Sequence, residues 1–251
     1  SKFHPSKANC ALLNYDEYTG EYQAYPSNTK ATDAVEDALL EFAGPDNFIT
    51  TYRSDNADEL RKALKLLKAH PDTSTPNRMS SKGYVECRVR IISEGARCVL
   101  YQSGLPVDAW PEAVVYWCLG HNMVEEYTYP DGTVATPYFR KHGHECGAPN
   151  IPFGALVVVK KTPPMLKAQE NFETKTMDCI FAGWKRKSGG AIGKSCLFWS
   201  LESILSNPGN LPALIETTDY ELPVFDNIRF PWAEARDEAL KQRCIGFQES
   251  E

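Results

Sequence analysis

Strand-like and helix-like spacings of apolar residues alternate in the first part of the chain. Residues 9–25 hold two strand-like runs around the sequence Asp-Glu-Tyr-Thr-Gly, which suits a tight turn, and they predict a β-hairpin. Residues 29–43 and 58–69 show apolar positions at helical spacing and predict two helices, which end at Gly-Pro and His-Pro. Residues 48–52 predict a short strand between them. This alternation of strands and helices is typical of an α/β domain.

The middle of the chain has a mostly helical pattern. Residues 72–83 are polar and predict a loop. Residues 84–102 place apolar side chains at the 3.6-residue spacing of one helix face and predict a long helix, and residues 108–123 predict another. Residues 127–152 are rich in Pro, Gly and His and predict irregular structure.

A different pattern begins near residue 150. Residues 153–161, 177–184 and 195–200 predict strands that are separated by turns rich in Gly, Pro and Lys. They indicate a small β-rich unit over residues 150–230. Residues 231–244 predict an amphipathic helix at the end of the chain.

Composition restricts the class of protein. The chain has 251 residues, of which 42% are hydrophobic and 24% charged, and these fractions exclude a disordered or fibrous protein. No apolar run approaches the ~18 residues of a membrane helix, so we expect no membrane partner. The eight cysteines are scattered and form no CxxC pair, which indicates free thiols in an intracellular, reducing compartment, the nucleus or cytoplasm. Because the first residue is not Met, we expect a fragment or a processed product.

Charge is distributed unevenly along the chain. The net charge is −6, but residues 60–100 contain nine Lys or Arg residues and three acidic residues, so this segment carries +6 and the remainder −12. Such a segment is either a surface that faces a polyanion or a solvated helix face. Charge alone favours the solvated face.

Two carboxylates have positions that suit metal binding. Asp55 follows a predicted strand, and Glu86 lies near the start of the long predicted helix, with Lys82, Arg88 and Arg90 close to it in sequence. Carboxylates at such positions can bind hard cations, two of which would serve phosphodiester chemistry, and the cations of the side chains could hold phosphates. Spacing alone favours the structural alternative, in which each carboxylate caps or begins a helix.

Two further motifs are weaker. Residues 188–195 are similar to a phosphate-binding loop, but Ser188 replaces the first glycine and the neighbours are strands, so a hairpin is predicted. His142, His144 and Cys146 could supply three zinc ligands, yet no fourth ligand is near in sequence, so loop histidines are favoured over a zinc site.

Several motifs occur in the order found in one known family. The arrangement resembles the retroviral integrase core as found in copia-type retrotransposon polyproteins, over residues 10–200. The segments that carry the resemblance are Arg-Ser-Asp-Asn-Ala-Asp-Glu-Leu at 53–60, Val-Glu-Cys-Arg at 85–88, Ser-Gly-Leu-Pro at 103–106, Thr-Pro-Tyr at 136–138 and Cys-Ile-Phe-Ala-Gly-Trp at 179–184. They are similar to the family's Asp-Asn-Gly-x-Glu motif, its Val-x-Glu-(Arg/Lys) helix start, the run after its catalytic Glu, its Thr-Pro-Tyr-Glu, and a motif of its downstream SH3-like domain.

The resemblance implies an α/β fold with an RNase H-like mixed sheet and flanking helices, followed by an SH3-like β domain. It implies an integrase-core-like domain over residues 1–145 that lacks its first strand, the SH3-like domain over 146–230, and a helix or tail over 231–251. It also implies DNA integration, in which Asp55 and Glu86 would bind Mg²⁺ or Mn²⁺ together with a third carboxylate.

Departures from the family pattern predict an incomplete active site. The third carboxylate belongs to a strand upstream of the hairpin, and the chain begins after it; Asp16 matches a non-catalytic acid of the family, and the upstream zinc module is also absent. Ala57 replaces a glycine of the family motif. Only 30 residues separate Asp55 from Glu86, and the shortfall falls around residues 69–73, where the family has a strand.

We therefore expect an integrase-like protein that is catalytically incomplete. The alternative is a non-catalytic, domesticated remnant that acts as a nucleic-acid-binding or protein-interaction module, and an unselected fragment without a function is a third reading. The partners expected are DNA, bound weakly and without sequence preference, a protein, or a second copy of the chain. Lys82, Arg88, Arg90 and Arg97 are the candidate DNA contacts.

Overall fold

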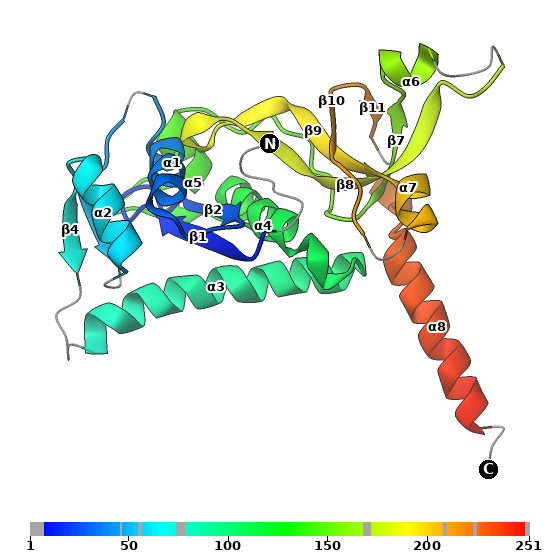
Figure 1. The fold of residues 1–251 in the computed structure, drawn as a ribbon, viewed down its shortest axis with the longest axis horizontal. Helices are drawn as coiled ribbons and strands as arrows, with labels where there is room; N and C mark the ends of the chain where they lie inside the picture. The colour runs from blue at the N-terminus through cyan, green and yellow to red at the C-terminus, as the bar shows by residue number, and fades with distance from the viewer. Residues whose placement is uncertain are drawn as a thin grey trace. The chain divides into compact units, whose positions relative to one another are not determined.

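A computed structural model describes residues 8–45, 47–54, 57–73, 79–167, 172–207, 210–222 and 225–248 (Figure 1). The chain divides into two compact units. The first unit comprises Ser1–Ala96, Val114–Gly147 and Arg186–Gly193. The second unit comprises Arg97–Ala113, Ala148–Lys185 and Lys194–Glu251. This division differs from the predicted domains, 1–145, 146–230 and 231–251. Arg97–Ala113 belongs to the second unit, Arg186–Gly193 belongs to the first, and the tail belongs to the second.

The first unit begins with the predicted hairpin. Strand β1 (Cys10–Tyr15) pairs antiparallel with β2 (Tyr22–Ser27), and the register places Tyr15 opposite Tyr22. Gly20 has φ +78°, a left-handed conformation that glycine adopts readily and that the tight turn requires. Helix α1 (Thr32–Ala43) follows and ends at Gly44.

A second strand pair lies in the same unit. Strand β3 (Thr51–Ser54) pairs in parallel with β4 (His70–Thr73), and α2 (Asp58–Leu66) connects them. The expected loss of a strand around residues 69–73 is therefore wrong, as is the start of the polar loop at residue 72. A short, polar strand that contains Pro71 has little strand signal, but a proline is tolerated where no ladder hydrogen bond is required of it. Leu12 of β1 and Tyr52 of β3 pack against a core formed by Val35, Leu39, Leu60, Ala63, Leu64 and Ala69.

Two helices of the central segment differ from their predicted bounds: the first is longer than residues 84–102, and the second begins two residues after and ends one residue after the predicted 108–123. Helix α3 spans Met79–Ser103, and α4 spans Trp110–Val124 after a short 3₁₀ turn at Val107–Ala109. The segment predicted to be irregular, 127–152, contains strands β5 (Tyr127–Thr128) and β6 (Val134–Ala135) and helix α5 (Pro137–His142). The Thr136 hydroxyl caps α5 by accepting from the Phe139 N–H at 3.1 Å.

The second unit contains a five-stranded sheet. Its strand order is β10 (Ile215–Thr217), β9 (Ile192–Ser200), β8 (Thr176–Arg186), β7 (Leu156–Lys160) and β11 (Tyr220–Glu221). The helices α6 (Pro163–Lys167), α7 (Leu201–Ser206) and α8 (Pro231–Gln248) complete it, with a 3₁₀ turn at Phe225–Asn227. A further 3₁₀ turn, Ser188–Gly190, lies between β8 and β9 and belongs to the first unit. Buried aromatic rings form its core, and Phe181 contacts both Trp184 and Phe198 edge-on.

The predicted α/β class is confirmed. Helices accompany both antiparallel and parallel strand pairs, and the β-rich pattern after residue 150 corresponds to the five-stranded sheet. The turn at Ser188–Gly190 joins two strands, so the segment similar to a phosphate-binding loop is a hairpin, as predicted. Within the described residues, none of the helices has the length and hydropathy to cross a membrane.

The contact between α3 and α4 generates the first prediction. A Cβ atom on Gly95 would lie 2.0 Å from the Trp117 indole nitrogen, so Gly95→Ala should lower the free energy of unfolding by about 1–3 kcal/mol. Gly120→Ala is the matched control, because that helical glycine has open space and alanine favours a helix, so this variant should be neutral or more stable. Chemical denaturation of both variants measures the difference, and equal stabilities would contradict the contact.

Candidate functional site

The structure describes only one of the two predicted catalytic carboxylates. Asp55 lies outside the described residues, directly after β3. Glu86 lies on α3 and is exposed, and Lys82 lies on the same helix with a side chain outside the described part. The approach of Asp55 to Glu86 therefore stays a prediction.

Metal ligands do not gather in the described part of the chain. Among these residues, no group of three or more His, Cys, Asp or Glu side chains could hold a metal ion. Of the predicted ligands for Mg²⁺ or Mn²⁺, the described side chains include Glu86 alone, which does not suffice for a hard cation. His142 packs against the Tyr138 ring, with 4.5 Å between ring centroids, and burial lowers the pKa of His142 to about 4.

Asp16 has a structural position in the β1–β2 turn. Its carboxylate accepts hydrogen bonds from the Thr19 hydroxyl at 2.7 Å and the Tyr18 N–H at 3.0 Å. These contacts shape the turn, which agrees with the interpretation of Asp16 as a non-catalytic acid.

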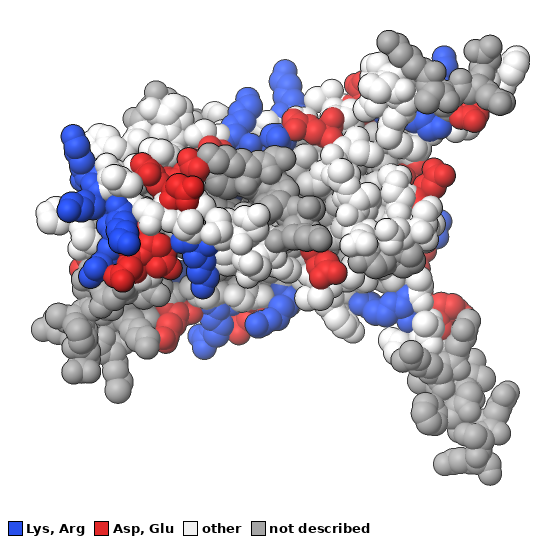
Figure 2. Space-filling view, in the orientation of Figure 1, with Lys and Arg blue, Asp and Glu red and all other residues white. Residues whose placement is uncertain are grey.

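The cations of the segment 60–100 are mostly exposed. Figure 2 shows Lys and Arg side chains gathered over α2, where Arg61, Lys62 and Lys65 are exposed. Arg90 and Arg97 on α3 are also exposed. Arg61 forms an ion pair with Asp58 at 2.9 Å. Contact of Arg90 and Arg97 with DNA stays a prediction.

Arg88 differs from its neighbours because three tyrosines surround it. Its guanidinium carbon lies 4.1 Å from the centroid of the Tyr15 ring, and it donates hydrogen bonds to the hydroxyls of Tyr22 (2.8 Å) and Tyr84 (3.3 Å). Burial opposes the charge of Arg88, but the hydrogen bonds to Tyr84 and Tyr22 and the electrostatic interactions with Tyr22 and Tyr15 together raise its pKa. Burial also raises the pKa of Tyr15 to about 12, against the opposing effect of Arg88. The guanidinium thus has partners within the protein, and nothing in the sequence pattern predicted this aromatic cluster.

A cavity of about 610 Å³ lies beside this cluster. Residues of β1, β3, the end of α1 and the first half of α3 line it, including Asn14, Arg53 and Arg88. The cavity is larger than the gaps left by ordinary side-chain packing and within the size range of ligand sites.

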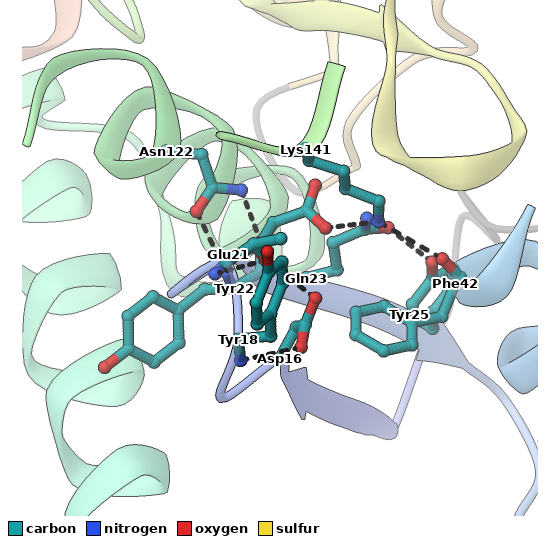
Figure 3. A network of polar contacts seen from close by, with 10 residues as sticks. Asp16, Tyr18, Glu21, Tyr22, Gln23, Tyr25, Phe42, Asn122 and Lys141 are labelled. Carbon is teal, nitrogen blue, oxygen red and sulfur yellow. Dashed lines mark hydrogen bonds and ion pairs between the residues drawn. The ribbon is translucent and has the colours of Figure 1, made fainter. Parts of the chain in front are cut away.

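A buried polar network lies on β2 (Figure 3). Glu21 is 0% exposed and forms an ion pair with Lys141, whose ammonium group also donates to the Phe42 carbonyl at 3.4 Å. Gln23, also 0% exposed, accepts a hydrogen bond of 2.5 Å from the Tyr25 hydroxyl. Burial raises the pKa of Glu21, and the charge of Lys141 opposes that rise.

The side chain of Asn122 ties α4 to β2 in the same network. Its amide nitrogen donates to the Tyr22 carbonyl at 2.7 Å, and its amide oxygen accepts from the Tyr22 N–H at 2.9 Å. These two bonds satisfy backbone groups of a strand that has its other neighbour in β1. In the sequence, the network was visible only as two polar residues, Glu21 and Gln23, at alternate positions of a predicted strand. A strand with one face exposed to solvent has the same pattern, so the sequence did not reveal that these residues are buried.

The ion pair generates a prediction on stability and pH. Lys141→Met leaves the Glu21 carboxylate buried without its cation and should lower the free energy of unfolding by about 3–5 kcal/mol at pH 8. The loss of the cation raises the pKa of Glu21 further above its unfolded value, so stability falls as pH rises and the variant should be less impaired at pH 5. Adding Glu21→Gln should remove this extra pH dependence. Denaturation at both pH values measures the effect, and an identical loss at pH 5 and pH 8 would contradict it.

Two of the solved structures similar to this chain belong to retroviral integration. A chain of the simian T-cell lymphotropic virus intasome, solved in complex with PP2A regulatory subunit B56 gamma, shares 14% sequence identity; the match covers 86% of this chain and 72% of that chain, with a TM-score of 0.40. The catalytic core domain of BIV integrase shares 19% identity; the match covers 52% of this chain and 85% of that chain, with a TM-score of 0.37. No family model and no curated protein matches. At this identity and TM-score, the likenesses assign neither an activity nor a site to the chain.

Proposed function

We propose that this chain is an integrase-like protein that binds DNA weakly and without sequence preference. The observation that carries the proposal is the exposure of Lys62, Lys65 and Arg90 on α2 and α3 of the first unit, and of Arg97 further along α3. Exposed cations attract the phosphates of DNA irrespective of base sequence. The acidic remainder of the chain opposes long-range attraction, so the affinity is low and depends strongly on salt.

The family motifs support a copia-type origin for the same chain. In this proposal the second unit is the SH3-like domain, and Asp55 and Glu86 are the remaining two of three catalytic carboxylates. Asp16 is occupied in the β1–β2 turn and does not replace the third. The chain therefore binds DNA without transferring strands by itself.

A second candidate function, a protein-interaction module, is favoured by a different observation. Residues of β1 and β3, each of which has one strand neighbour among the described residues, line the same cavity in the first unit. Unpaired strand edges are sites at which another polypeptide can add a strand.

DNA binding is tested by its salt dependence. We expect binding to a labelled duplex near 50 mM salt that weakens steeply towards 200 mM. Because Arg90 and Arg97 are exposed, replacing both by Ala should flatten the slope of log affinity against log salt by roughly two phosphate contacts. Fluorescence anisotropy across a salt series measures the slopes.

The matched control removes two exposed lysines outside the basic segment. Lys187→Ala with Lys194→Ala lowers the net charge by the same amount and should change the slope by less than one contact. If the unaltered chain shows no binding near 50 mM salt, the basic segment is a solvated face and the proposal is wrong. The same conclusion follows if both double variants flatten the slope of log affinity against log salt equally.

Catalysis is tested separately with the two carboxylates. With Mg²⁺ or Mn²⁺ and a duplex substrate, the unaltered chain should produce no more strand-transfer product than the double variant Asp55→Asn with Glu86→Gln. Gel analysis of labelled DNA measures the product. Activity that the unaltered chain has and the double variant lacks would overturn the proposed catalytic incompleteness.

A further inference from the structure

The strand β2 has one strand neighbour, β1, among the described residues. At the turn between them, the Asp16 N–H donates to the Glu21 carbonyl at 2.9 Å. Bonded and non-bonded pairs alternate along an antiparallel ladder, so Tyr22, which lies opposite Tyr15, belongs to a non-bonded pair. The backbone groups of Tyr22, and of every second residue after it, therefore point away from β1.

Three residues of β2 thus form its outer edge: Tyr22, Ala24 and Pro26. Tyr22 is 1% exposed and Ala24 is 0% exposed, so this edge is shielded from water. A buried backbone group needs a hydrogen-bond partner within the protein, and in a sheet that partner is usually another strand. At this edge, side chains take the place of the strand.

Asn122 of α4 occupies the position of a neighbouring strand at Tyr22. Figure 3 shows its side-chain amide beside the Tyr22 backbone, where it donates to the carbonyl at 2.7 Å and accepts from the N–H at 2.9 Å. A primary amide carries both a donor and an acceptor, as one residue of a strand does. Another strand therefore cannot pair with Tyr22 while Asn122 is in place.

Arg186 occupies the next outward position. Its guanidinium donates to the Ala24 carbonyl at 2.8 Å, and its guanidinium carbon lies 4.1 Å from the centroid of the Tyr25 ring. A charged side chain directed at a strand edge is one of the means by which proteins prevent edge-to-edge pairing. Pro26, the third outward residue, has no N–H and cannot donate to another strand.

The segment that follows Arg186 lies against the same strand. A Cβ atom on Gly190 would lie 2.2 Å from the Gln23 amide nitrogen and 2.4 Å from a Glu21 carboxylate oxygen. Glycine alone permits so close an approach, and the φ of +86° at Gly190 also favours glycine. Arg186–Gly193 belongs to the first unit, so the contact with β2 lies within that unit.

The strand β2 has no charged residue of its own to prevent pairing. Tyr22–Ser27 contains no Asp, Glu, Lys or Arg, whereas unprotected edge strands commonly carry such charges. Two copies of β2 aligned antiparallel about Ala24 meet no like charges, and tyrosine favours strands. A second copy of the chain is therefore the occupant that this edge would accept if the side chains were removed.

We propose that Asn122, Arg186 and Pro26 form an edge cover, which closes β2 to strand addition by a second copy of the chain. The edge cover is a conformational device: β2 is unavailable while α4 and Arg186–Gly193 lie on it, and their displacement exposes the backbone of Tyr22 and Ala24. This inference concerns neither the cavity nor DNA binding, so it stands or falls independently of the proposed function.

Hydrogen exchange of the unaltered chain tests the edge cover first. The Tyr22 amide should be protected to the same degree as the Gln23 amide, which the register directs towards β1. In Asn122→Ala, the Tyr22 amide should exchange roughly tenfold faster or more, and the Gln23 amide less than about threefold faster. Gly120→Ala, on the same helix and in open space, is the matched control and should change neither rate.

Two results of this measurement would overturn the proposal. An unprotected Tyr22 amide in the unaltered chain would mean that Asn122 does not cover the edge. Equal acceleration of the Tyr22 and Gln23 amides in Asn122→Ala would mean that the side chain contributes only general stability.

Self-association tests what the edge cover prevents. The double variant Asn122→Ala with Arg186→Met should form dimers or larger species that increase with concentration in sedimentation velocity, beyond any that the unaltered chain forms. Gly95→Ala is the matched control, because its clash is with Trp117 on α4 and leaves Asn122 and Arg186 in place. Denaturant brings the two variants to the same free energy of unfolding before they are compared.

The association must also involve β2. In the associated species, the amides of Tyr22 and Ala24 should exchange roughly tenfold more slowly, or slower still, than in the dilute double variant. Association without this protection, equal association of the Gly95→Ala control, or no association of the double variant would each overturn the proposal. If the double variant does not fold, the exchange rates of the unaltered chain and of Asn122→Ala decide the outcome.

Discussion

The pairing of the strands β1 and β3, each with a single neighbour among the described residues, determines how the first unit is arranged. Within the part of the chain that the structure describes, β1 and β3 each have a single strand neighbour, and residues of both strands line one cavity. The helices α1 and α3 also supply apolar side chains to the lining of that cavity. The hairpin turn, the tyrosine cluster and the polar network all surround this arrangement within the first unit.

Two charged side chains of the first unit, Glu21 and Arg88, are stabilised in different ways. Glu21 is neutralised by Lys141 across the chain, and the pair brings α5 to β2 and to the end of α1. Arg88 instead rests on aromatic rings and hydroxyls, which stabilise a cation without cancelling its charge. The Glu21–Lys141 pair has no net charge. The cluster around Arg88 retains a net positive charge at the wall of the cavity.

The resemblance to the integrase core and the exposed charges of the described residues support different parts of the proposed function. The order of the motifs carries the resemblance to the integrase core, which extends from the hairpin to the five-stranded sheet. The exposed cations of α2 and α3 carry the proposed binding of DNA. In this proposal the chain retains a DNA-binding role without catalysis.

The sequence by itself determined the elements whose signal is local. The hairpin over 9–25, the long helix over 84–102 and the β-rich pattern after residue 150 follow from residue spacing and turn residues, since these restrict the backbone independently of distant contacts. β4 escaped prediction because four residues that include a proline have almost no periodic signal, and only pairing with β3 makes them a strand. Tertiary structure alone decided that Glu21 and Gln23 are buried, that Arg88 lies among tyrosines while Arg90 is exposed, and that residues of β1 and β3 line one cavity. These outcomes depend on contacts between residues far apart in the chain, such as Arg88 with Tyr22, and no local pattern encodes them.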